Sequence, residues 1–500
     1  MSLTRGDLAN EVSPLRFPDL SALSGEALQS AGAYLGDLFT PNLRLGVTGL
    51  SRSGKTVFIT ALIRNLVTQG RLPFFAVSAE RRLTGAYLVP QPDDAVPRFD
   101  YEAHVAALSA DPPAWPESTR HISELRVTIE FKPETALRRA IGVPRLNVDI
   151  VDYPGEWLID LGMLDQSYEQ WSTEAMKLAR EALRANAAAP WLAHAATLDP
   201  AAPENEQAAI AGARIFTAYL HAARGARGGT STLSPGRFLM PGDLAGSPLL
   251  TFFPLDVPPG GAAARGSLGA MMERRFESYK SHVVRPFFRD HFSRIDRQIV
   301  LVDVLAALNE GPAAVNDLQR ALEAALRAFR PGANSWLSLL TGRRIDKLLF
   351  AATKADHLHH SSHDRLEAIL RLVTDRAIAR AADAGADVGV LALAALRATR
   401  EAEAKHDGER LPCIIGTPLP GEVVDGQTFD GIREAAIFPG DLPIDPSAAL
   451  DRAGTLGNAA MFVKFRPPRV RPAGADGTTP PLPHVRLDRA LEFLLGDRLS

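Results

Sequence analysis

The residues best suited to chemistry in this chain form a short loop at positions 49–56 (GLSRSGKT), which fits the pattern G-x-x-x-x-G-K-[ST]. In such a loop the backbone N–H groups surround phosphate oxygens, the lysine supplies a positive charge for the β- and γ-phosphates, and the last hydroxyl binds Mg²⁺. Apolar residues at 43–48 predict a strand that enters the loop, and helical spacing at 57–67 predicts the helix that leaves it. We therefore predict a nucleoside triphosphate site contacted by Gly49, Ser51, Arg52, Ser53, Gly54, Lys55, Thr56 and Val57.

An acidic motif follows a second predicted strand. Residues 146–151 (LNVDIV) form a β-branched run, and residues 152–155 (DYPG) come directly after it. At such a strand end, phosphate-loop proteins carry an acidic residue that coordinates Mg²⁺ through water, and a glycine amide that faces the γ-phosphate. We expect these roles for Asp152 and Gly155. The alternative for Asp152 is an ordinary turn residue.

A threonine ahead of the strand predicted at 126–131 offers a further metal ligand. Thr119 is placed like the threonine that joins Mg²⁺ only when a γ-phosphate is present. With Thr56 and Asp152 it completes the predicted metal set, and the alternative is a polar surface side chain.

The base is predicted by residues 353–356 (TKAD), which follow the apolar run 347–352 and resemble a guanine-recognition motif. A carboxylate there can accept hydrogen bonds from the N1–H and 2-amino groups of guanine, whereas adenine offers no such donor pair. A helix-capping role for Asp356 is the alternative. After the next strand, a backbone amide at 394–395 is expected to contact the guanine oxygen. The predicted base-contacting residues are Thr353, Lys354, Asp356, Ala394 and Ala395.

Glu156 occupies the position where Ras-like proteins carry the glutamine that orients the attacking water. A carboxylate can polarise water, but a triphosphate repels its charge, so we expect slow hydrolysis in which Lys55, Thr119 and Glu156 take part. An assisting cation could come from several arginines, for each of which a solvated surface role is the alternative: Arg52, Arg120, Arg274, Arg275, Arg285 and Arg289.

The composition narrows the class of protein. With 500 residues and 46% hydrophobic content the chain can bury a large core, and 55 basic residues nearly balance 58 acidic ones. The chain therefore has no strong overall electrostatic field of the kind that favours binding to nucleic acid. A single cysteine excludes an internal disulfide and fits the cytoplasm, and the longest apolar runs are too short to span a bilayer. We expect no integral membrane segment, while peripheral membrane contact stays open.

Two further features invite interpretation. Apolar segments at 238–243 and 249–255 could contact a partner or a membrane, and core packing is the alternative. Histidines at 357, 359, 360 and 363 could mimic a metal site, but lacking cysteines or a distant ligand they are interpreted as surface residues.

Apolar patterning indicates the order of elements. Residues 298–305, 347–352 and 388–394 predict buried strands, and 313–329 and 363–384 predict helices. Alanine-rich helices at 173–198 and 204–223 and a basic helix at 271–295 lie between the two halves of this pattern. The prolines of 71–120 indicate an irregular excursion, and short strands at 413–416 and 461–465 precede a helix near 486–495.

These elements predict an α/β fold of the P-loop NTPase (Ras-like) class. A mostly parallel sheet is flanked by helices, with a large helical insertion after the second switch and a small C-terminal α/β extension. The expected parts are an N-terminal helical extension (1–40), a first part of the nucleotide-binding domain (41–156), the inserted helical domain (157–297), a second part of the nucleotide-binding domain (298–405) and the C-terminal extension (406–500).

Taken together, seven segments resemble the bacterial YcjX family: 49–56, 115–119 (WPEST), 152–157 (DYPGEW), 236–255, 298–312, 353–356 and 392–401. The resemblance covers nearly the whole chain. It implies a Ras-like GTP-binding domain interrupted by a helical domain, in a stress-associated cytoplasmic family whose members are also described as ATPases. Ras-like nucleotide roles carry over to Gly49, Gly54, Lys55, Thr56, Asp152, Gly155, Lys354 and Asp356, whereas the glutamine and the base-loop lysine of Ras-like proteins have no match.

The sequence therefore favours a Mg²⁺-dependent GTP-binding switch whose γ-phosphate state reaches a protein effector through the switch loops and the insert. An ATP-dependent ATPase or kinase-type enzyme, and a scaffold that a nucleotide merely stabilises, are the alternatives.

Overall fold

The computed structural model describes residues 40–50, 52–117, 121–134, 144–225, 232–257, 264–326, 345–406, 409–424, 426–450, 462–470 and 480–500. Two compact units divide the chain, Met1–Pro41 and Asn42–Ser500, and the second unit carries the fold described below. The helix predicted at 23–39 lies outside the described residues.

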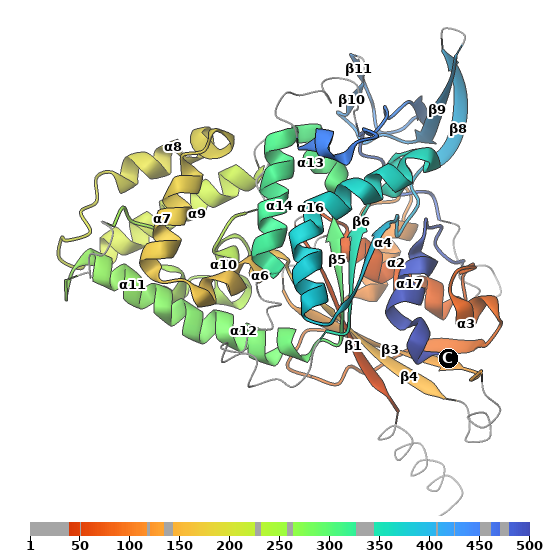
Figure 1. Ribbon diagram of the computed structural model, residues 1–500, viewed down its shortest axis with the longest axis horizontal. Helices are drawn as coiled ribbons and strands as arrows, with labels where there is room; N and C mark the ends of the chain where they lie inside the picture. Colours follow the sequence, from red (N-terminus) through yellow and green to blue (C-terminus); the bar gives the residue numbers. More distant parts are fainter. Residues whose placement is uncertain are drawn as a thin grey trace, which may run out of the picture. The chain divides into compact units, whose positions relative to one another are not determined.

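A seven-stranded sheet forms the centre of the second unit, in the order β2-β3-β4-β1-β5-β6-β7 (Figure 1). Strands β4, β1, β5, β6 and β7 run parallel, while β3 is antiparallel to both β2 and β4. This confirms the predicted mostly parallel α/β class. The strand bounds are β1 Asn42–Gly49, β2 Leu83–Val89, β3 Ser123–Phe131, β4 Arg145–Asp152, β5 Arg297–Val302, β6 Lys347–Ala352 and β7 Asp387–Ala392.

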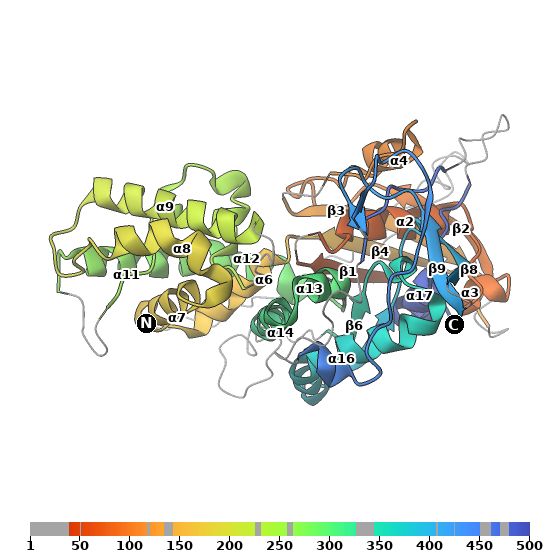
Figure 2. The ribbon, with the colours of Figure 1, turned by 90° about the horizontal axis from the view of Figure 1, so that it is seen from above.

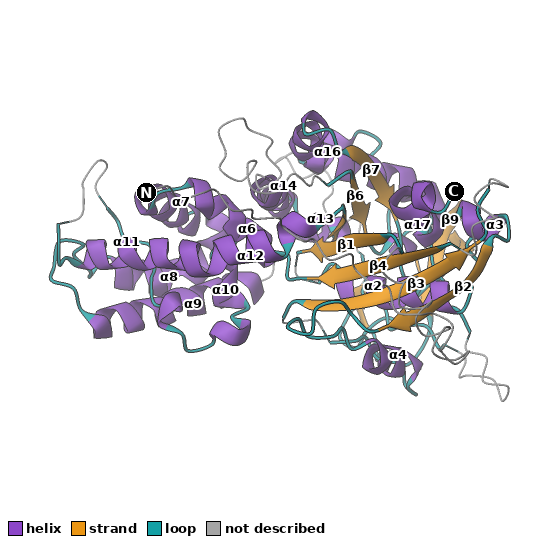
Figure 3. Cartoon of the chain, turned by 90° about the horizontal axis from the view of Figure 1, so that it is seen from below, coloured by secondary structure: helices purple, strands orange, loops and turns teal. Residues whose placement is uncertain are grey.

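The central strands are buried on both faces, which explains their continuous apolar sequences. In β5, Ile299 and Leu301 belong to one core, and Val300 and Val302 to another. The second core contains residues of three helices, α13 (Val304–Glu310), α14 (Pro312–Leu326) and α16 (His363–Asp383). The sheet and its flanking helices are drawn in Figure 3.

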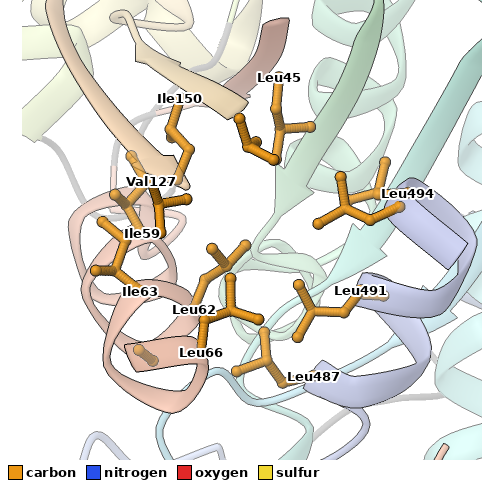
Figure 4. Close-up of a cluster of buried hydrophobic side chains, with 14 of the residues drawn as sticks. Leu45, Ile59, Leu62, Ile63, Leu66, Val127, Ile150, Leu487, Leu491 and Leu494 are labelled. Atoms are coloured by element: carbon orange, nitrogen blue, oxygen red, sulfur yellow. The ribbon is translucent and has the colours of Figure 1, made fainter. Parts of the chain in front are cut away.

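The first core joins two helices that are far apart in the sequence, α2 (Lys55–Val67) and α17 (Leu487–Leu495). Leucines 487, 491 and 494 of α17 face the cluster that contains Ile59 and Leu62 of α2 (Figure 4). The fully buried guanidinium of Arg297, at the start of β5, also holds this end of the chain, because it lies 2.6 Å from each carboxylate oxygen of Asp497. Thus α17, predicted within the C-terminal extension, packs into the sheet's main core.

Helices between β4 and β5 build a third core (Figure 2). Phe238, Phe252 and Phe253 are at most 3% exposed within it, so these residues pack in the core. The helices are α6 Glu156–Leu161, α7 Tyr168–Ala179, α8 Ala182–Ala195, α9 Glu206–Gly225, α10 Gly236–Leu239, α11 Leu268–Tyr279 and α12 Arg285–Asp290. The domain boundaries given above remain predictions.

Two predicted helices are divided in the structure. The stretch 173–198 consists of α7 and α8, and Glu181 at the break receives a bidentate pair from Arg320 of α14. The stretch 271–295 contains a π-helical turn, Lys280–Val284, directly before α12. Pro286 in α12 lacks an N–H and displaces the carbonyl one turn earlier, which accounts for the wider turn.

The prediction of an irregular excursion at 71–120 was wrong, because this region contains β2, α3 (Ala76–Ala79) and α4 (Tyr101–Ser109). Its prolines lie between these elements and so concealed them. In the C-terminal part, β8 (Arg400–His406), β9 (Glu409–Gly416) and β12 (Ala435–Ile437) form a sheet, and β10 (Val423–Val424) pairs with β11 (Gln427–Thr428). The predicted strand 461–465 is only an isolated bridge, Pro418 to Phe465, and Met461 lies outside the described residues.

Among the described helices, none combines the length and the apolar character that a membrane crossing requires.

The packing of α17 makes a stability prediction. Leu491→Ala removes a side chain with 0% exposure from the first core, so we expect the free energy of unfolding to fall by about 2–5 kcal/mol in a urea titration. Ile432→Ala, at a side chain that is 79% exposed, is the control and should change it by less than about 0.5 kcal/mol. Equal effects of the two variants would contradict this packing.

Candidate nucleotide site

The phosphate loop lies between β1 and α2, in the middle of the sheet. Strand β1 pairs with β4 on one side and β5 on the other, and α2 begins at Lys55. Gly54 has a φ of 89°, a left-handed conformation that glycine adopts without strain, and it turns the chain into the helix. The ammonium group of Lys55 donates to the carbonyl oxygen of Gly49 at 3.0 Å. Since an ammonium has three donors, this contact leaves capacity for phosphate oxygens.

The loops after β1 and β4 touch each other. A Cβ atom on Gly155 would lie 2.5 Å from the carbonyl oxygen of Gly49, so this approach requires glycine. Asp152, which pairs in register with Val47, is 1% exposed at the end of β4. The sheet therefore brings the acidic motif against the phosphate loop.

A cavity of about 500 Å³ opens at the phosphate loop, and Gly49, Asp152 and Gly155 are not among its lining residues. Its volume falls within the range of about 300–1,000 Å³ that is usual for ligand sites. Predicted site residues from two distant parts of the sequence line it: Arg52, Ser53, Gly54, Lys55, Thr56, Val57, Thr353, Lys354, Asp356, Ala394 and Ala395. The structure thus brings together the predicted phosphate-binding and base-binding segments.

The carboxylate of Asp356 is held in place by the chain that follows β7. Its Oδ2 accepts from the amide of Ala398 at 2.7 Å, and the hydroxyl of Thr399 donates to its backbone carbonyl. Lys354 has a left-handed φ of 61°, and its ammonium group is paired with Asp303. Because one oxygen of Asp356 is committed to Ala398, the orientation of the whole carboxylate is set before any ligand binds.

The amide of Ala394, predicted to contact the base, is already hydrogen-bonded within the protein. The amide of Ala394 donates to the carbonyl of Val485 at 3.0 Å, and Val485 donates back at 2.8 Å. This pairing ties the loop to the segment before α17. Although both Ala394 and Ala395 line the cavity, an amide contact with a base would therefore come from Ala395 or the following residue.

Several lining residues were missed from the sequence. Trp115, His357, Lys464 and Phe465 all face the cavity. The indole N–H of Trp115 donates to the carbonyl of Phe465 at 2.8 Å, and the rings of His357 and Phe465 meet edge to face at 5.1 Å. His357, interpreted as a surface residue from the sequence, is instead buried, and this burial lowers the pKa of its imidazole. No local pattern connects these residues, although Trp115 begins the WPEST segment.

Glu156 lies outside the cavity lining and is directed to the helical insert. Its Oε1 is 3.0 Å from Nη2 of Arg224, near the end of α9, and the glutamate side chain is 8% exposed. Arg224 was not among the arginines considered from the sequence. Of those, Arg52 lines the cavity, whereas Arg274, Arg275 and Arg289 are paired with Glu204, Glu206 and Asp290.

The remainder of α6 is also fixed to the insert. Asp160 accepts from the hydroxyl of Tyr279 at 2.6 Å and from the amide of Gly236 at 2.7 Å, and burial raises its pKa from 3.8 to about 6. The guanidinium of Arg237 lies 3.4 Å above the ring of Trp157. A Cβ atom on Gly236 would lie 2.3 Å from the carbonyl oxygen of Glu156. A displacement of α6 would therefore disturb the insert.

The donor set suits a hard cation. Thr56 and Asp152 offer hydroxyl and carboxylate oxygens, and both residues are buried. Thr56 ends the phosphate loop, and Asp152 pairs with Val47 of β1, the strand that enters this loop. Oxygen ligands of this kind are those that Mg²⁺ prefers. Ser51 and Thr119, the other polar residues predicted here, lie outside the described residues.

A mostly parallel sheet with this loop between β1 and α2 defines a P-loop fold of the Ras-like class. The chain belongs to the YcjX-like family (DUF463), which matches residues 43–499. It is 40% identical to the "Ras-like GTPase YcjX" of Escherichia coli strain K12 over 470 residues, covering 92% of this chain and 96% of that protein. It is 36% identical to the protein of the same name from Shewanella oneidensis over 481 residues, covering 92% and 95%. The predicted family is confirmed.

The contact between the two loops gives a direct test. Gly155→Ala should force the loop after β4 away from Gly49, because the new methyl group cannot occupy a position 2.5 Å from a carbonyl oxygen. We expect a loss of about 1–3 kcal/mol in stability and weaker binding of nucleoside triphosphates, measured by thermal unfolding and by titration. Gly85→Ala is the matched control, since its nearest neighbour atom lies 3.8 Å away. If the two variants bind nucleotide alike, the loop contact has no role in binding.

Proposed function

We propose that this chain binds GTP and GDP with Mg²⁺ and hydrolyses GTP slowly, as a switch whose nucleotide state is transmitted to the helical insert. The observation that carries the proposal is the cavity that joins the phosphate loop to Asp356, whose carboxylate is oriented by the Ala398 amide. The relatives named Ras-like GTPase support the guanine base and the reaction.

The proposed phosphate and base contacts come from residues that line the cavity, and the proposed metal and switch roles come from residues predicted around it. Backbone N–H groups of residues 52–56 and the ammonium of Lys55 bind the phosphates. Asp356 accepts from guanine N1–H and the 2-amino group, and the stem of Lys354 covers the base. A bound Mg²⁺, held through Thr56, Asp152 and Thr119, supplies charge neutralisation of the phosphates. Glu156 and Arg224 neutralise each other at the start of α6. The negative charge of the glutamate therefore does not repel the γ-phosphate.

Transmission to the insert follows from the chain between Gly155 and Asp160. Gly155 meets the phosphate loop, and the next residue begins α6. A change at the γ-phosphate that moves Gly155 must move α6, and with it the contacts to Arg224, Gly236 and Tyr279. We infer that the insert and the switch loops form the surface that an effector protein recognises, and that the protein works in the cytoplasm.

The choice of base is tested by thermal shift titration with GTP, GDP and ATP. Ligand binding raises stability by RT ln(1 + [L]/Kd), so GTP and GDP should raise the melting temperature and ATP should raise it much less. Asp356→Asn keeps an oxygen for the Ala398 amide but presents an NH₂ group to guanine donors, so we expect guanine affinity to fall at least about 10-fold. Asp375→Ala, an exposed carboxylate on α16, is the control.

Protection by ATP but not by GTP would overturn the guanine proposal in favour of an ATPase or kinase-type enzyme. Binding of GTP without any turnover would favour a scaffold that the nucleotide stabilises.

The Glu156–Arg224 pair is tested by a double-mutant cycle. If the pair senses the γ-phosphate, Glu156→Gln and Arg224→Gln should change the ratio of GTP to GDP affinity to a similar extent, and the double variant should add little. GTP turnover should rise in Glu156→Gln, because the amide loses the ion pair with Arg224 and can then reach and orient the attacking water without adding a negative charge. Arg274→Gln, on an exposed arginine of the insert, is the control. Additive effects of the two substitutions would show that the residues act separately.

A further inference from the structure

Two histidines and a glutamate from separate segments converge on the surface outside the nucleotide cavity. His359 and His360 follow the segment that carries Asp356, and Glu401 belongs to β8. Nδ1 of His360 lies 2.8 Å from Oε2 of Glu401, and Nε2 of His359 lies 3.9 Å from the same oxygen. One nitrogen of each imidazole and one carboxylate oxygen all lie within 4.8 Å of one another. In the described part of the chain, no other group of three such residues meets this criterion.

The separations match those within a metal coordination shell. With metal–ligand bonds of about 2.0–2.2 Å and tetrahedral angles, neighbouring ligand atoms lie about 3.3 Å apart. The observed 2.8 and 3.9 Å lie on either side of this value, so small side-chain rotations suffice. The ring centroids of the two imidazoles lie 4.2 Å apart, with the ring planes tilted by 40°.

Ser361 contacts the other ring nitrogen of His359. Its hydroxyl lies 2.9 Å from Nδ1, and its backbone N–H donates to the same nitrogen at 3.4 Å. Coordination of a metal through Nε2 places the ring proton on Nδ1, where the Ser361 hydroxyl can accept it in exchange for the contact with the Ser361 N–H.

An exposed His360–Glu401 ion pair is the simpler interpretation, but it accounts for only one of the two histidines.

We propose that His359 Nε2, His360 Nδ1 and Glu401 Oε2 bind a divalent transition metal ion of the zinc type. Imidazole and carboxylate ligands suit Zn²⁺ and Co²⁺ better than Mg²⁺, which prefers oxygen alone. The site differs from the Mg²⁺ site proposed at Thr56 and Asp152. A bound ion cross-links the segment after Asp356 to β8, directly beside Ala398 and Thr399, which hold Asp356.

The test is a calorimetric titration of the untagged, nucleotide-free chain with ZnCl₂ in excess Mg²⁺, followed by CoCl₂ with visible absorption. We expect one Zn²⁺ per chain, and His360→Ala and Glu401→Gln should each weaken the binding at least 10-fold. Glu403→Gln, on the same strand, and His282→Ala, on an exposed histidine of the insert, are the matched controls and should bind as the parent does. Cobalt absorption of a four-coordinate site should appear in the parent and controls only.

Absence of stoichiometric Zn²⁺ binding, or equal binding by Glu401→Gln and Glu403→Gln, would overturn the proposal. Thermal unfolding without metal separates a loss of ligands from a loss of fold, because both glutamate variants should then melt at the parent temperature.

Discussion

The approach of two backbones, at Gly155 and Gly49, is the constraint on which the rest of the site depends. It exists because β1 and β4 are parallel neighbours, so their carboxyl ends open at the same edge of the sheet. Neither glycine could carry a side chain there, since a Cβ atom on Gly49 would lie 2.4 Å from the carbonyl oxygen of Leu301. The packing of three strand ends thus places an acidic motif, a phosphate loop and a helix start within contact distance.

The insert is joined to this edge through one short helix. Contacts from α6 to the insert are of several kinds: an ion pair at Glu156, a cation–π contact at Trp157 and a buried hydrogen-bonded carboxyl at Asp160. A buried polar group that loses its partner costs free energy. Positions of α6 in which these contacts are only partly made are therefore unfavourable. Discrete arrangements are what a proposed two-state switch requires.

The fold and the main loops could be predicted because they depend on patterns of residues that are contiguous in the sequence. The phosphate loop, the apolar strands and the run before Asp356 are contiguous patterns, and the structure has strands and helices within one to three residues of most of them. Features set by tertiary contacts escaped prediction. Lys464 and Phe465 reach the cavity from far along the chain, and Arg224 meets Glu156 across α9. Prolines caused two different prediction errors. Those around β2 made the region look irregular, so the strand was not predicted, and Pro286 interrupts a helix that the sequence pattern predicted as regular.

The place of α17 in the first core has a consequence for how this protein is made. Helix α2, which carries Lys55 and Thr56, is synthesised early, yet the leucines that cover one side of its core arrive only with residues 487–495. During translation, the apolar side of α2 that packs against α17 therefore stays uncovered until residues 487–495 have been synthesised. Until that face closes, it is a surface that chaperones of the nascent chain can recognise.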